Sequence, residues 1–374
     1  MNKFYLGKLV FRSEMRRILI LRNNELFKHN FGSWHPLKSE RMNTYFKLLE
    51  EKSITNLANV KVLDTSLIVN DEDILTVHDE SLLNLIKSLS IRGGALDSDT
   101  PVPPGTYDRA RIQAGGLIEG ALRVLNNEYD VAIQCVAFGG HHATRRHVGF
   151  SFGFCYFNQE AILIRYLQRR KYVERILVLD CDAHHGNGIQ EIFYSDPTVL
   201  YISLHQDPNT LYPGTGFIHE IGEDKGLGYN INIPLPPGTS DENYIKALNE
   251  VFKPIAYQFK PNIILWIFGA DTYFADPLTS LNLTMNGYSR ITDIIMDVGD
   301  KLCSGKLIVE FGGGYDILST SLAFYLVTAR LAGLNIKIDD PYSPPKGESE
   351  AISRRVETLI VEIKKTLSKY WLLE

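Results

Sequence analysis

The second half of the chain alternates short apolar runs with longer amphipathic segments. The apolar runs are VAIQCVAF (131–138), RILVLD (175–180), VLYISLH (199–205), NIILWIFGAD (262–271) and KLIVEF (306–311). Segments such as QEAILIRYLQRRKY and NGYSRITDIIMDVGDKL lie between them and have helical character. This alternation indicates βαβ units, and strands that are apolar on both faces are typical of a parallel sheet covered on both sides. We predict a three-layer α/β/α fold with a central, mainly parallel sheet, formed as a single domain over residues 1–374.

The two ends of the chain have a different pattern. The first hundred residues are less periodic and lead into the proline-rich stretch DSDTPVPPGTYDRARIQAGG. We interpret them as a cap and rim of the same domain. Near the C-terminus, apolar residues at three- and four-residue spacing predict an amphipathic packing helix. These residues are Ile352, Val356, Leu359, Ile360, Ile363 and Leu367.

Composition narrows the class of protein. A chain of 374 residues can bury a large core, and its formal net charge of -5 gives no electrostatic footprint for nucleic acid. No apolar run is long enough to span a membrane. Cys135, Cys155, Cys181 and Cys303 show no CxxC pairing and are best explained as reduced thiols, most of them in apolar surroundings. We expect a soluble, cytoplasmic protein, and its oligomeric state stays open.

Polar residues with catalytic potential gather where the predicted strands end. GGHH follows the first run, DCDAHHGNG closes the second, HQD follows the third, GAD closes the fourth and GGGY follows the fifth. In open α/β sheets the ligand crevice lies outside the carboxyl ends of the strands. Residues that are far apart in the sequence should therefore converge on one site.

Three of these residues are suited to hold a metal ion. Alternate residues of an extended strand point the same way, so Asp182 and His184 can face one ion together. Asp271 ends a strongly apolar run, where a charge is costly without a partner. A lone Asp at a strand end more often caps a turn. Two carboxylates and an imidazole together favour a catalytic site for zinc or ferrous iron, with positions left for water and substrate.

Two further motifs suit proton transfer and oxyanion stabilisation. His141 and His142 are adjacent, which makes them poor joint ligands of one ion but a suitable acid/base pair around a bound water. Tyr315 follows three glycines and could donate its hydroxyl to an oxyanion. Taken alone, paired histidines have little specificity, and Tyr315 would be interpreted as a core residue after a tight turn.

The ordered set of motifs resembles the histone deacetylase superfamily. The similar segments are GGHHA, GFCYFN, LDCDAHHGNG, YISLH, YPGTG, FGADTYFADPL and FGGGYD. The resemblance runs from about HPLKSER to GGGYD and covers most of the chain. The DPL ending and the compact length are more similar to the bacterial and archaeal branch, which includes acetoin-utilisation proteins and acetylpolyamine amidohydrolases.

The resemblance implies roles for individual residues. It implies that Asp182, His184 and Asp271 bind a catalytic zinc ion, that His141 and His142 form the acid/base pair, and that Tyr315 polarises the amide carbonyl. It further implies that Asp180 lies behind His141. Asp180 is also implied as a ligand of a structural potassium ion, with Ser203 and the backbone of Asp182, His184 and Leu204. A second monovalent-ion site is implied at Phe193, Asp196, Val199 and Tyr229.

The same resemblance implies a narrow channel for an acylated alkyl amine. Its lining residues are Asp99, Gly153, Phe154, Tyr212 and Leu278. Asn187 stands behind His142 where many members have Asp, which removes a negative charge and should leave His142 less basic. Tyr273 and Phe274 are bulkier than the usual residues and are expected to narrow the channel mouth.

These observations predict metal-dependent hydrolysis of an acyl amide, with acetate and a free amine as products. The substrate is an acylated lysine or a small acylated amine such as an acetylpolyamine, with zinc as the metal and ferrous iron as the alternative. A catalytically weak protein that binds acyl-amines and acts in regulation is a second hypothesis. A dinuclear ureohydrolase is a third, although His185 and Tyr273 stand where that chemistry needs carboxylates.

Overall fold

The protein is built on one open sheet of parallel strands. A computed structural model describes residues 15–146 and 152–373. Its sheet is 8-stranded with the order β2-β1-β3-β8-β7-β4-β5-β6, and every neighbouring pair is parallel. The strands are β1 (Ile18–Arg22), β2 (Val60–Asp64), β3 (Val131–Cys135), β4 (Ile176–Asp180), β5 (Val199–Gln206), β6 (Asn230–Leu235), β7 (Ile263–Phe268) and β8 (Leu307–Phe311). The predicted fold class is confirmed.

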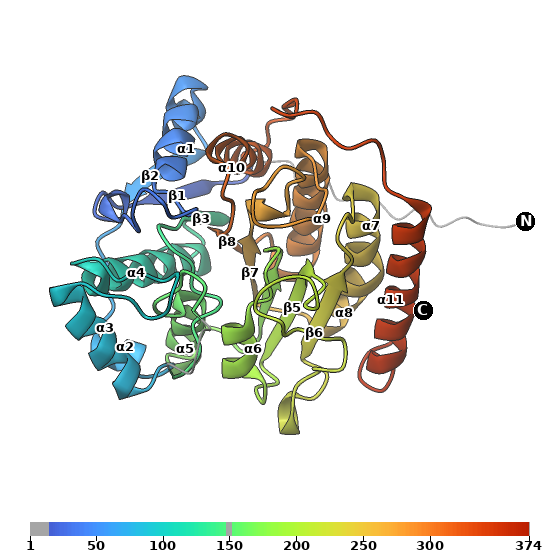
Figure 1. The fold of residues 1–374 in the computed structure, drawn as a ribbon, viewed down its shortest axis with the longest axis horizontal. Coiled ribbons are helices and arrows are strands. Elements are labelled where there is room, and N and C mark those ends of the chain that lie inside the picture. The colour runs from blue at the N-terminus through green and yellow to red at the C-terminus, as the bar shows by residue number, and fades with distance from the viewer. Residues whose placement is uncertain (1–14, 147–151, 374) are drawn as a thin grey trace, which may run out of the picture.

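Helices cover both faces of this sheet. They are α1 (Glu40–Glu51), α2 (Asp71–Ile74), α3 (Glu80–Arg92), α4 (Thr106–Leu125), α5 (Gln159–Arg169), α6 (Asn187–Phe193), α7 (Asp241–Ala247), α8 (Lys253–Phe259), α9 (Met285–Cys303), α10 (Ile317–Leu331) and α11 (Glu350–Leu367). Helices α1, α10 and α9 pack side by side on one face, and α4 packs with α5 on the other (Figure 1). The C-terminal helix α11 was predicted from its spacing.

The N-terminal part of the chain contributes more than the predicted cap and rim. Strands β1 and β2 belong to the sheet, where β1 pairs with β3 and β2 forms one edge. Strand β6 at the opposite edge was also not predicted. The apolar residues of β1 are bounded by arginines, β2 is only partly buried, and β6 alternates asparagine with isoleucine, so none has the long apolar pattern of a central strand. The prediction of one domain over 1–374 includes residues 1–14, 147–151 and 374, which lie outside the described residues.

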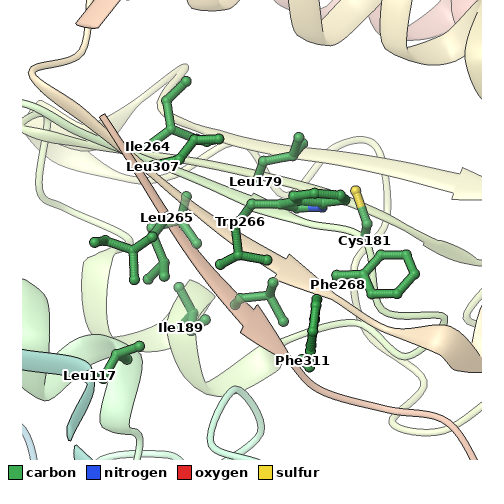
Figure 2. Close-up of a cluster of buried hydrophobic side chains, with 14 of the residues drawn as sticks. Leu117, Leu179, Cys181, Ile189, Ile264, Leu265, Trp266, Phe268, Leu307 and Phe311 are labelled. Atoms are coloured by element: carbon green, nitrogen blue, oxygen red, sulfur yellow. The ribbon is translucent and has the colours of Figure 1, made fainter. Parts of the chain in front are cut away.

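The central strands carry a continuous hydrophobic core. Trp266 and Phe268 of β7 lie among buried side chains of β4 and β8, and Ile189 of α6 belongs to the same cluster (Figure 2). Side chains cap the N-termini of some of these helices, including Asn158 before α5 and Asp316 before α10. These caps fix where α5 and α10 begin after the loops that precede them.

Removing one side chain from this core should be costly. Leu179 of β4 is 0% exposed and lies in register with Ile202 and Trp266. Leu179→Ala should lower the free energy of unfolding by about 2–5 kcal/mol, because it leaves a cavity in the sheet. Urea denaturation measures this loss. The control Ile91→Ala removes a side chain that is 83% exposed and should change stability by less than about 0.5 kcal/mol. Equal effects of the two variants would contradict this account of the core.

Candidate active site

The predicted chemical groups converge at the carboxyl ends of four neighbouring strands. The strands β3, β8, β7 and β4 are adjacent in the sheet. The segments that follow them carry the histidine pair, Tyr315, Asp271 and the Asp182–His184 segment, in that order. Because all these strands run parallel, their carboxyl ends share one edge of the sheet. The sheet thereby brings together residues from four separate motifs.

Asp182, His184 and Asp271 form one buried cluster. Their potential ligand atoms all lie within 4.8 Å of one another. His184 Nδ1 is 2.8 Å from Asp271 Oδ2 and 3.2 Å from Asp182 Oδ1. The backbone holds the carboxylates in place, since Asp182 Oδ2 accepts the N–H of Gly313 at 2.9 Å and Asp271 Oδ1 accepts the N–H of Ala183 at 3.0 Å. A Cβ atom on Gly313 would lie 2.5 Å from Asp182 Oδ2, so this close approach requires glycine.

The donor set fits a divalent cation. Burial and the neighbouring Asp182 carboxylate raise the pKa of Asp271 to about 8 when no cation stands between the two groups. Two carboxylates and one imidazole supply hard and borderline ligands that suit zinc or ferrous iron, and three protein ligands leave positions for water and substrate. A cation between the carboxylates would compensate their mutual repulsion.

His141 and His142 lie next to each other but have different partners. Their ring centroids are 4.1 Å apart. His141 Nδ1 is 3.1 Å from Asp180 Oδ2, whereas His142 Nδ1 is 2.8 Å from the amide oxygen of Asn187. A carboxylate behind one ring and a neutral amide behind the other give the two histidines unequal basicity.

The pKa values of the two histidines move in opposite directions. Burial disfavours the charged form of His141, but the carboxylates of Asp180 and Asp182 outweigh it and raise its pKa to about 9. Burial, together with the charges of His141 and His184, lowers the pKa of His142 well below its usual value. A charged and a neutral imidazole side by side are the arrangement that an acid/base pair requires.

Tyr315 lies against the cluster and is anchored by its backbone. Its ring contacts His184 and Phe154 edge to face, with centroids 6.2 and 5.9 Å apart. Its N–H donates to Asp276 Oδ2 at 2.9 Å. Asp276 is buried, and burial raises its pKa to about 7.

Two supporting residues were not predicted from the sequence. Asp276 holds the backbone of Tyr315, and Tyr201 donates its hydroxyl to Asp180 Oδ2 at 2.9 Å. Asp276 could have been predicted from the segment ADPL, because an acidic residue before proline in a loop tends to accept hydrogen bonds from nearby backbone N–H groups. Tyr201 had no such signal, since its apolar run predicts only a buried strand residue.

A channel leads to the cluster. It has a volume of ≈ 330 Å³ and its lining includes all five channel residues that the resemblance implies. Those residues are Asp99, Gly153, Phe154, Tyr212 and Leu278, and Pro36, His142, His184, Leu211 and Tyr315 complete the lining. Gly153 has φ 44, and a Cβ atom there would lie 2.6 Å from the His142 ring. The wall is mainly apolar, and its polar groups are the Asp99 carboxylate, the imidazoles of His142 and His184, and the Tyr315 hydroxyl.

The prediction that Tyr273 and Phe274 narrow the channel mouth is wrong. Neither lines the channel, and Tyr273 is only 1% exposed. Its ring packs on Phe274 with centroids 4.3 Å apart. The short 3-10 turn Ala270–Thr272 after β7 directs Tyr273 into the core instead of toward the mouth.

The residues of each implied monovalent-ion site lie near one another, and in the second set the N–H of Asp196 donates to Phe193 and that of Val199 to Asp196. Asp180 of β4 and Ser203 of β5 are register partners on adjacent strands, and Ser203 Oγ is 2.8 Å from His205 Nδ1. In the second set, a carboxylate oxygen of Asp196 is 2.6 Å from Arg165 and the other accepts from Thr198. Occupation of either set by potassium stays a prediction.

Comparison with known proteins defines the family. Residues 35–331 match the family model described as histone deacetylase domain, so the chain belongs to the histone deacetylase family. The crystal structure of the HDA15 HD domain superposes with a TM-score of 0.83 at 27% identity and covers 95% of both chains. The chain is therefore an enzyme of the kind that hydrolyses acetyl amides.

Curated relatives place it in the AcuC-like branch. A probable deacetylase of Archaeoglobus fulgidus is 39% identical over 94% of this chain and 98% of its own length. A histone deacetylase-like amidohydrolase of Pseudomonas aeruginosa is 37% identical over 73% of this chain and 71% of its own. The acetoin utilization protein AcuC of Bacillus subtilis is 35% identical over 77% and 74%.

Proposed function

We propose that this protein removes an acetyl group from a linear acylated amine, a lysine side chain or a polyamine, with one zinc ion held by Asp182, His184 and Asp271. The observation that supports this most is the meeting of that cluster, the His141/His142 pair and Tyr315 at the inner part of an apolar channel. A metal ion in such a site polarises the amide carbonyl and lowers the pKa of a bound water.

The chain's own residues would divide the remaining work. The aromatic walls of the channel would hold the alkyl arm of the amine in an extended form. Neutral His142 would accept a proton from the attacking water, and charged His141 would support the developing charge and supply a proton to the leaving amine. The Tyr315 hydroxyl would donate a hydrogen bond to the oxyanion.

The direct test is a panel of substrates on zinc-reconstituted protein. It should contain acetyl-lysine peptides, acetylpolyamines and longer acyl-lysines, with release of the free amine as the readout. Turnover of at least one acetylated amine is expected. No turnover on any member would favour the alternative in which the chain binds acyl-amines without hydrolysing them.

The dinuclear ureohydrolase alternative has less support. In the described residues, one group of three possible ligands is found, Asp182, His184 and Asp271. His185 is hydrogen-bonded through Nδ1 to Thr215 and through Nε2 to Gln190, and Tyr273 is buried. Metal analysis should therefore give about one equivalent of zinc per chain. Two equivalents of manganese with arginase-type activity would reverse the assignment.

The proposal also includes a bound potassium ion and a cytoplasmic location. We infer that potassium occupies the site around Asp180 and Ser203. The described cysteines are buried and unpaired, which suits a reducing compartment such as the cytoplasm. In the described ranges no helix is both long and apolar enough to cross a membrane.

The channel wall gives a test of substrate binding. Tyr212 is 36% exposed, and its ring lies 5.1 Å from that of His142. Tyr212→Ala should raise KM for an acetyl-lysine peptide about tenfold, which corresponds to about 1.4 kcal/mol of lost apolar contact, with a smaller effect on kcat. Steady-state kinetics measure the change. Tyr172→Ala removes a tyrosine that is 48% exposed outside the channel lining and should leave KM unchanged. If the KM of Tyr212→Ala equals that of the wild type, Tyr212 does not contribute to substrate binding.

A further inference from the structure

The backbone of the channel wall has positive φ at two successive residues. Gly153 has φ 44 and Phe154 has φ 66, and both residues line the channel. Glycine adopts positive φ freely, but a residue with a Cβ atom is destabilised there, because the Cβ atom crowds a backbone carbonyl oxygen. A bulky residue keeps this left-handed conformation only where surrounding contacts hold it. The conformation of Phe154 therefore depends on its partners.

A second segment that borders the channel is the turn of residues 94–102, which we call the rim hairpin. An antiparallel bridge between Ala95 and Pro101 closes it. It contains Asp99, which lines the channel, and next to it Thr100, which is 0% exposed. A buried hydroxyl needs hydrogen-bond partners, and those of Thr100 connect the rim hairpin to the channel wall.

The hydroxyl of Thr100 bonds to two residues of the channel lining. Thr100 Oγ1 accepts the N–H of Phe154 at 3.2 Å and donates to Asp99 Oδ1 at 3.4 Å. Nearby, Asp97 Oδ2 accepts the N–H of Phe152 at 3.3 Å. The rim hairpin thus accepts alternate N–H groups of the segment that ends in Phe154, and Thr100 holds the strained residue itself.

The ring of Phe154 has contacts that depend on the same hairpin. It packs edge to face on His35, with ring centroids 4.4 Å apart, and on Tyr315 at 5.9 Å. His35 Nδ1 accepts the N–H of Leu37, so His35 Nε2 donates to the carbonyl oxygen of Asp99 at 3.0 Å. The rim hairpin therefore holds the backbone of Phe154 directly and its ring through His35.

We propose that Thr100 is a positioning residue, whose hydroxyl holds Phe154 in the left-handed conformation and so fixes the Phe154 ring on the wall that binds the substrate arm. If the hydroxyl is removed, the strained backbone and a buried N–H without this acceptor both favour rotation of the peptide. The ring then leaves its contacts with His35 and Tyr315. Thr100 thereby acts on substrate binding and not on the reacting atoms. This role rests on the proposed function.

Hydrogen exchange tests the contact without catalysis. The exchange rate of the Phe154 N–H can be measured by NMR on zinc-loaded protein that contains isotope-labelled phenylalanine. Thr100→Val keeps the shape of the side chain but removes the acceptor, so the rate should rise about tenfold, as expected for the loss of one hydrogen bond. Thr100→Ser keeps the acceptor and should retain the wild-type rate. A wild-type rate in Thr100→Val overturns the proposal.

Steady-state kinetics test the effect on substrate binding. Thr100→Val should raise KM for an acetyl-lysine peptide about fivefold, with a smaller effect on kcat and no change in zinc content. Thr100→Ser should have the wild-type KM. The matched control Thr292→Val removes a buried hydroxyl that bonds the carbonyl oxygen of Tyr288 in its own helix at 2.7 Å, and it should leave KM unchanged. A wild-type KM in Thr100→Val, or loss of zinc from that variant, overturns the positioning role.

A double-mutant cycle identifies the residue through which Thr100 acts. Once Phe154→Ala has removed the ring, the addition of Thr100→Val should raise KM no further, because the two changes act on one contact. Thr100 also donates to the Asp99 carboxylate, and an effect through that bond would persist without the ring. The same rise of KM in both backgrounds therefore overturns the proposal.

The two proposals fail in different ways. If the wild-type protein hydrolyses no acyl amide, the proposed function is overturned, and hydrogen exchange alone decides whether Thr100 holds Phe154. If the wild type hydrolyses acyl amides and Thr100→Val does so with the same KM, the positioning role is overturned and the proposed function stands.

Discussion

Replacement of Asp271 by asparagine should remove zinc binding and, with it, turnover. The amide oxygen of asparagine can still accept the N–H of Ala183, which Asp271 Oδ1 accepts at 3.0 Å, so the local fold should persist. The variant loses a negative charge within 2.8 Å of His184 Nδ1 and presents an amide where a ligand oxygen stood. Loss of a supporting residue outside the ligand set already costs about 10–100-fold in metal affinity, and a direct ligand should cost more.

Metal analysis after reconstitution and calorimetric zinc titration measure this effect. Asp339→Asn is the matched control, since it removes the same charge from a side chain that is 91% exposed. The control should bind about one equivalent of zinc, as the wild type does. Wild-type zinc affinity and turnover in Asp271→Asn would rule out Asp271 as a ligand and, with it, the proposed site.

Replacement of Tyr315 by phenylalanine should separate catalysis from metal binding. The ring stays packed against Phe154 and His184, and the backbone N–H keeps its bond to Asp276, so only the hydroxyl is lost. Removal of one oxyanion donor typically lowers kcat by about 10²–10³-fold. KM and zinc content should change little, because neither depends on the hydroxyl.

Steady-state kinetics with the best substrate of the panel and zinc analysis together provide the readout. Tyr342→Phe serves as the control, since it removes a hydroxyl that bonds Asp316 on the surface. It should retain wild-type kcat. Normal turnover in Tyr315→Phe would exclude the oxyanion role, whereas loss of zinc in that variant would show that the hydroxyl acts on the metal site instead.

The sequence was most informative where side-chain chemistry coincides with a strand end. The alternation of Asp182 and His184 at the end of an apolar run predicted that both face one point, and the structure brings them within ligand distance of each other. Asp271 could be added because a charge at the end of NIILWIFGA needs a partner. The parallel sheet brings Asp271 to the other two residues, since it aligns the ends of β4 and β7 as neighbours.

Other features depend on tertiary contacts that no local pattern encodes. Asp276 acts on Tyr315 through a backbone N–H 39 residues away, and Tyr201 reaches Asp180 from the neighbouring strand. Tyr273 was misplaced because its nearness to Asp271 in sequence says nothing about the turn between them. Strand β2 was missed because partial burial at the sheet edge leaves a mixed polar pattern, and β1 was missed because its four apolar residues are bounded by Arg17 and Arg22.

The position of β1 and β2 beside β3 bears on how the chain folds. Arg41, from the helix between these two strands, donates to the carbonyl of Gly312, 271 residues further along the chain. Proteins rich in contacts between distant segments fold slowly, because closing long loops costs entropy before the contacts form. The wall of the catalytic cavity is complete only when the earliest and latest strands have joined one sheet. Recovery of catalytic activity during refolding should therefore lag behind recovery of helical structure.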